Sequence, residues 1–222
     1  MVEILPGVHT IDGINPSPDF TTHVYLLKES GSRWTLVDTG LPGSDVAIVK
    51  YLNARKIPPT SVHRILITHL HRDHTGNLRK LAELTKAKTF AHWIEAGFIA
   101  ERPKYDGPGV PPAEPFEVHE KVKDGDSIDS FGGLEVLHTP GHTPGHTAFY
   151  QRERKLLFSG DLFMGPTNHL TLTVPEYTLH TGTAQVSARR VSSFPIESLL
   201  IYHGDPVLKG AQGAVRSVVA GF

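Results

Sequence analysis

The stretch that most constrains this chain is residues 69 to 74, which read His-Leu-His-Arg-Asp-His and so place three histidines and an aspartate within six positions. They directly follow residues 64–68, a β-branched and apolar run typical of a buried strand. Imidazole nitrogens and carboxylate oxygens are the ligands that suit zinc and its first-row neighbours. Histidines in a polar loop are often simply exposed, but four such residues at the mouth of a strand rarely arise by chance. The stretch therefore predicts a metal site at a strand end.

The same residue types recur at the ends of other strand-like runs. These runs and the residues after them are 134–137 before His138, His142 and His146, 156–158 before Asp161, and 199–202 before His203. Proline and glycine between the histidines of the first of these segments predict a sharp turn with close backbone approach. The recurrence of a strand followed by candidate ligands predicts one shared site.

The order His-x-His-x-Asp-His resembles the metallo-β-lactamase superfamily, in its glyoxalase II and lactonase-like branch. The resemblance extends from Asp38 to His203. The family pattern Thr-Pro-Gly-His-Thr selects His142 over His138 and His146. The resemblance implies one metal held by His69, His71 and His142, a second held by Asp73, His74 and His203, and Asp161 bridging the two.

The resemblance also implies the fold, an α/β (α+β) chain forming a four-layer αββα sandwich in which two mixed β-sheets are flanked by helices. We expect residues 1–222 to form a single domain of this kind. Hydrophobic periodicity agrees, because it predicts helices over residues 44–55, 76–86, 92–101, 183–194 and 209–220 between strand-like runs. Nineteen residues follow His203, so we expect the added C-terminal helical domain of glyoxalase II to be missing.

Further residues are candidates for supporting roles. Asp38, in an Asp-x-Gly at a strand end, and His146 are expected to contact the metal ligands and orient them. Asp73 is also the candidate that passes a proton to the leaving group. The candidate substrate contacts are Tyr105 and Phe116 in a proline-rich segment, and His169 and His180 in a poorly periodic one.

The resemblance implies two divalent metal ions, with zinc as the first choice and iron, manganese or cobalt as alternatives. Two such ions share a hydroxide that attacks an ester, lactone or thioester, with phosphotriesters as side substrates. Two other functions stay open. One is a mononuclear iron persulfide dioxygenase, which shares the first histidine cluster, His142 and Asp161. The other is a non-catalytic metal-binding module.

Composition limits the partners. The formal net charge is −1, so no nucleic-acid or membrane surface is indicated. The chain has no cysteine, which excludes disulfides and thiolate ligands. No apolar run is long enough to cross a bilayer, and the start lacks the features of a secretory signal. We therefore expect a cytoplasmic protein with a small-molecule substrate, and leave a homo-oligomer open.

Overall fold

Two mixed β-sheets organise the chain in a computed structural model that describes residues 2–12, 22–101, 107–109, 114–166 and 169–222. The first sheet has seven strands in the order β1-β2-β3-β4-β5-β6-β7, and the second has five in the order β14-β11-β10-β9-β8. In the first sheet β1 to β4 pair antiparallel, and β4 to β7 pair parallel. In the second, β8 to β11 pair antiparallel, and β11 pairs parallel with β14.

The elements have the following bounds. The strands are β1 Val2–Leu5, β2 Val8–Asp12, β3 His23–Lys28, β4 Trp34–Val37, β5 Val62–Ile67, β6 Lys88–His92, β7 Glu120–Val122, β8 Ser127–Ile128, β9 Leu134–His138, β10 Thr147–Gln151, β11 Leu156–Phe158, β12 Phe163–Met164, β13 Thr171–Leu172 and β14 Ser198–Leu200. The α-helices are α1 Asp45–Ala54, α2 Arg72–Thr75, α3 Leu78–Thr85, α4 Trp93–Ala100, α5 Thr181–Val191 and α6 Ala211–Val219. Short 3-10 helices are η1 Pro59–Ser61, η3 Gly160–Leu162 and η4 Pro175–Tyr177.

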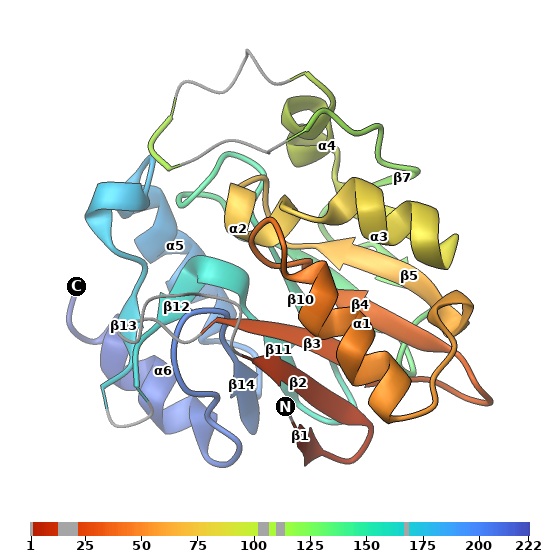
Figure 1. The fold of residues 1–222 in the computed structure, drawn as a ribbon. Coiled ribbons are helices and arrows are strands. Elements are labelled where there is room, and N and C mark those ends of the chain that lie inside the picture. The colour runs from red at the N-terminus through yellow and green to blue at the C-terminus, as the bar shows by residue number, and fades with distance from the viewer. Residues whose placement is uncertain (1, 13–21, 102–106, 110–113, 167–168) are drawn as a thin grey trace.

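Three apolar cores separate four layers. Successive side chains of a strand point to opposite faces, so Ile65 packs toward the helices while Leu66 packs between the sheets. In the second sheet, Phe158 packs between the sheets and Leu157 packs on the outer side, with residues of α5 and α6. Figure 1 shows α1, α3 and α4 on one side of the strands and α5 and α6 on the other. The predicted αββα sandwich with two mixed sheets is confirmed.

Local differences from the predictions lie in the helices. The helix predicted over residues 76–86 is α3, which is shorter, and the four-residue helix α2 precedes it and was not predicted. The helix predicted over residues 183–194 begins at Thr181 and ends at Val191, and the apolar side chain of Val186 on this helix is 63% exposed. Among the described residues, no helix has the length and apolar character needed to cross a membrane.

Candidate metal centre

Three histidine ring nitrogens converge at the end of β5. His71 Nδ1 lies 3.1 Å from His69 Nε2 and 3.0 Å from His142 Nε2. Nitrogens bound to one tetrahedral zinc at about 2.0–2.1 Å would be roughly 3.3 Å apart. All three rings are buried. The group formed by His69, His71 and His142, called the first group below, therefore has the spacing that a single ion needs.

In His71 and His69, the ring nitrogen that points away from the other two histidines makes a hydrogen bond to an oxygen atom. His71 Nε2 donates to the carbonyl of Pro108 at 3.1 Å, since a carbonyl only accepts. His69 Nδ1 donates to Thr68 Oγ1 at 3.1 Å, because that hydroxyl gives its own proton to Asp38 Oδ2 at 2.9 Å. Each proton therefore lies on the outer nitrogen, and each inner nitrogen keeps a lone pair for a metal.

Two threonines fix the third ring in the same way. Thr178 donates its hydroxyl proton to the carbonyl of Val174 at 2.7 Å, so it accepts from Thr173 at 3.0 Å. Thr173 then accepts from His142 Nδ1 at 2.9 Å, which leaves Nε2 of His142 with its lone pair. Neither threonine was predicted, because only the η4 turn brings them together and no motif marks that turn.

The Thr173→Val variant should weaken the first group while keeping the shape of the side chain. Without the hydroxyl, His142 loses the acceptor that selects its tautomer, and such losses reduce metal affinity or activity on the order of 10–100-fold. Metal affinity by chelator competition measures this. Thr171→Val is the control, since the Thr171 hydroxyl donates to the carbonyl of Met164 rather than holding a ligand ring. Equal metal affinities of the two variants would contradict the role of the Thr173 hydroxyl in orienting His142.

A second group combines carboxylates with histidines. His203 Nε2 lies 3.0 Å from Asp73 Oδ2, and His74 Nε2 lies 3.5 Å from the same oxygen. Asp161 Oδ1 lies 3.3 Å from His74 Nε2. One ligand atom from each of these four residues falls within 4.8 Å of the others. Asp73 and His74 come from α2, which places them on the same turn.

Asp161 lies between the two groups. Its Oδ2 is 3.5 Å from His142 Nε2 and 3.4 Å from His203 Nε2, so one oxygen faces both. Asp161 Oδ1 and His74 Nε2 are buried and make no hydrogen bond within the described part of the chain. Buried polar atoms of this kind are nearly always satisfied in folded proteins. Their lack of hydrogen bonds, together with the facing lone pairs, fits a metal ion at each group.

His146 holds the backbone of Asp161 through a hydrogen bond. Its Nε2 accepts the backbone N–H of Asp161 at 3.1 Å, so its Nδ1 donates to Thr139 Oγ1 at 2.8 Å. Burial lowers the pKa of His146 to about 3, so the ring stays neutral. Gly160 has φ +51°, and a Cβ there would lie 2.7 Å from His146 Nε2. Glycine at this position thus allows the contact that holds Asp161.

Asp38 orients His74. It follows β4 with φ 61°, an uncommon backbone conformation for a residue with a side chain. Its Oδ1 accepts the Thr68 N–H at 2.8 Å, and its Oδ2 accepts His74 Nδ1 at 2.9 Å. The proton of His74 is thereby placed on Nδ1, and Nε2 is directed toward Asp73 and Asp161.

The two groups differ in charge. Burial lowers the pKa of His69 and His142 well below the usual value, which favours the neutral ring that binds metals. Burial also opposes a charge on His74, but Asp161, Asp73 and Asp38 raise its pKa well above the usual value. For His203, burial is likewise outweighed by the carboxylates, which raise its pKa to about 9. The first group is a neutral nitrogen set, whereas the carboxylates of the second group favour positive charge on His74 and His203, in the form of protons that a bound metal ion would replace.

The candidate substrate contacts are scattered. Phe116 packs against the core under α3 and α4, with the Arg79 guanidinium 5.8 Å from its ring centroid. His169 is exposed just before β13. Tyr105 lies outside the described residues. His180 is exposed and directly precedes α5.

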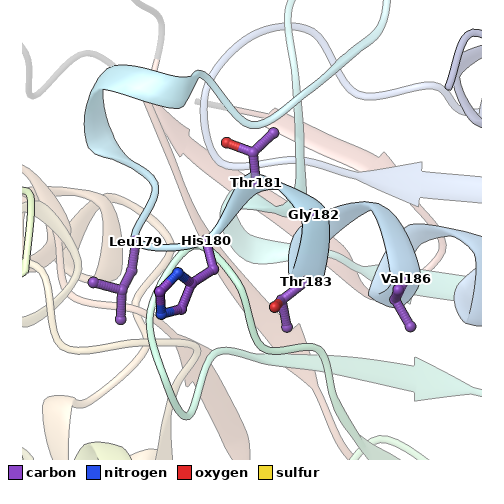
Figure 2. A pocket seen from close by; sticks show the side chains of 6 residues that line it. All are labelled: Leu179, His180, Thr181, Gly182, Thr183 and Val186. Carbon is purple, nitrogen blue, oxygen red and sulfur yellow. The ribbon is translucent and has the colours of Figure 1, made fainter.

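A hollow of about 730 Å³ lies at the start of α5 (Figure 2). Its lining residues are Leu179, His180, Thr181, Gly182, Thr183 and Val186. Backbone hydrogen bonds tie this segment to the loop that carries a ligand, from Leu179 N–H to the carbonyl of His142 at 3.1 Å and from His180 N–H to that of Gly141 at 2.9 Å. Of the three candidate substrate contacts that the structure describes, His180 is the one that lines this hollow.

The chain belongs to the metallo-beta-lactamase superfamily, whose family model matches residues 17–203. It is similar to a metallo-beta-lactamase family protein from Thermus thermophilus, with a TM-score of 0.76 and 25% identity over 99% of this chain and 79% of that one.

Two of the similar proteins are named as a hydroxyacylglutathione hydrolase and a thioesterase. The chain is 34% identical over 147 residues to a hydroxyacylglutathione hydrolase from Methylobacillus flagellatus, covering 64% of this chain and 48% of the relative. It is 28% identical over 200 residues to "Thioesterase pkgB" of Emericella nidulans, covering 89% of this chain and 50% of the relative. The first match supports the glyoxalase II-like branch. The chain spans about half the length of both relatives.

Proposed function

We propose that this chain is a dinuclear metallohydrolase that cleaves an ester, lactone or thioester in a small molecule, with phosphotriesters as side substrates. The observation that carries the proposal is the position of Asp161, whose carboxylate lies between two groups of candidate ligand atoms. A non-catalytic metal module needs only one closed site. Two groups sharing a carboxylate favour catalysis.

The ligand types support the metals named above. His69, His71 and His142 would hold one ion, and Asp73, His74 and His203 the other. Nitrogen and oxygen ligands suit zinc, and also iron, manganese and cobalt. Two such ions would lower the pKa of a water between them and stabilise negative charge on a carbonyl oxygen.

Asp73 is the proposed proton carrier. Its side chain is 25% exposed, whereas that of Asp161 is 5% exposed, so Asp73 is the carboxylate that a substrate can reach. The Tyr202 hydroxyl donates to the backbone carbonyl of Asp73, which steadies the turn without occupying the carboxylate. Asp73 would carry the proton on Oδ1, because Oδ2 faces the second group, and deliver it to the leaving oxygen or sulfur.

The two named relatives favour a thioester among the three substrate types. The direct experiment compares hydrolysis of thioester, lactone, ester and phosphotriester substrates with oxygen uptake on a persulfide, using metal-loaded protein. Hydrolysis without oxygen uptake supports the proposal, and oxygen uptake without hydrolysis would replace it by the dioxygenase.

The hollow at the start of α5 is the proposed substrate subsite. The Val186→Asp variant should lower kcat/KM for apolar substrates about tenfold, mainly through KM, because it removes an apolar contact. The matched control is Val46→Asp, since Val46 is 67% exposed on α1, on the opposite side of the sheets. Steady-state kinetics on the best substrate measures this. An unchanged KM in Val186→Asp would remove the hollow from the substrate site.

A further inference from the structure

Glu95 is a buried carboxylate that the metal centre described above does not use. It lies in the first turn of α4, and its exposed fraction is 0%. Burial raises its pKa to about 7, against hydrogen bonds that lower it. No described lysine or arginine acts on it as a charge partner. An unpaired buried acid is unfavourable, so its contacts have to account for it.

Three neutral donors from two loops point at this one carboxylate. Oε2 accepts the Leu70 N–H at 2.6 Å. Oε1 accepts the Gly145 N–H at 2.6 Å and the Thr143 hydroxyl at 3.0 Å. The two oxygens of Glu95 therefore hold different loops.

Both loops belong to the first group of ligands. Leu70 lies between His69 and His71, while Thr143 and Gly145 follow His142. A Cβ on Gly145 would lie 2.9 Å from Glu95 Oε1, so the loop reaches the carboxylate only because it has no side chain there. All three nitrogen ligands thus come from the two segments that Glu95 joins.

We propose that Glu95 is a positioning residue of the metal centre, whose carboxylate fixes the separation of the two loops that carry His69, His71 and His142. This inference rests on the proposed function. The role concerns the first group, because the three hydrogen bonds that Glu95 accepts all come from the segments that carry it.

A carboxylate is the side chain suited to this role. It offers acceptor oxygens in both directions, whereas an amide offers one oxygen and one donor. In Glu95→Gln the NH₂ must face either the Leu70 N–H or the Gly145 N–H, so one loop loses its acceptor in either orientation. The variant keeps the size of the side chain and removes only the ability to accept hydrogen bonds from both loops at once.

The test measures zinc affinity by chelator competition in two backgrounds. In His203→Ala only the first group stays complete, and adding Glu95→Gln should weaken zinc binding on the order of 10–100-fold. In His142→Ala the first group is already broken, and adding Glu95→Gln should leave the affinity of the second group unchanged. Circular dichroism confirms that each variant is folded.

The matched control is Glu29→Gln. The Glu29 side chain is 5% exposed and accepts the hydroxyls of Thr35 at 2.5 Å and Ser130 at 2.8 Å, with Arg64 at 3.1 Å. It shows what losing a buried carboxylate does where its hydrogen bonds come from residues outside the ligand loops. If Glu95→Gln does not fold, Thr143→Val removes one donor and should weaken the same group to a smaller extent.

The outcomes separate this inference from the proposed function. Equal zinc affinity with and without Glu95→Gln in the His203→Ala background would overturn the role of Glu95 and leave the metal centre intact. Equal weakening in both backgrounds would also overturn it, since the effect would then be general. A wild-type chain that binds no metal would overturn the proposed function and this inference together.

Discussion

The Asp161→Asn variant is expected to lose more metal and more activity than any variant that only alters a hydrogen bond to a ligand. Asparagine keeps the size of the side chain, but its amide removes the charge and one of the two oxygens that face the groups. The loss of hydrolysis should exceed the roughly 10–100-fold caused by removing a residue that orients a ligand. Metal content per chain and turnover on one ester substrate are the measurements.

Variants with smaller expected losses give a scale for the effect of Asp161→Asn. Asp38→Asn should reduce metal affinity less, because Asp38 contacts His74 rather than an ion. His146→Ala should likewise be milder than His142→Ala, because His146 holds the backbone of Asp161. If Asp161→Asn kept two metals and near-normal turnover, Asp161 would be a turn residue and the dinuclear proposal would fail.

Removal of metal should abolish hydrolysis and leave the fold in place. Three apolar cores pack the sheets and helices independently of the ligands, so we expect the circular dichroism spectrum to change little. Protein from which a chelator has removed the metal should regain hydrolytic activity when two equivalents of zinc are added. A single tightly bound iron, with no second equivalent on titration, would instead favour the persulfide dioxygenase.

Much of the fold could be predicted because both sheets have two covered faces. Strands in that position appear in the sequence as continuous apolar runs, and β11 and the last three residues of β5 are examples. The ends of β5, β11 and β14 lie next to candidate ligands in the sequence, so the candidate ligand set, which the structure brings together in two groups, followed from these strand ends and the family resemblance. The helix α2 was missed because four residues are too few for a helical period.

The residues that hold the ligands could not be predicted in the same way. In α4, Trp93 is 58% exposed while Glu95 is fully buried, the reverse of what amphipathic periodicity suggests. An acid in the first turn of a helix also looks like an ordinary response to the helix dipole. Thr173 and Pro108 reach His142 and His71 across 31 and 37 residues, a relation that only tertiary structure creates.

The outward nitrogens of His69, His71 and His142 already have partners within the protein, so the rings are oriented before any ion arrives. Loading would then cost little conformational entropy at these side chains, since their orientations are already set. Three ring nitrogens at a preset spacing would accept ions that tolerate nitrogen ligands at that spacing and would reject ions that demand a wide octahedral shell of oxygens. In this protein the discrimination between competing metals would therefore come from the rigidity of the protein rather than from the strength of the bonds to the metal.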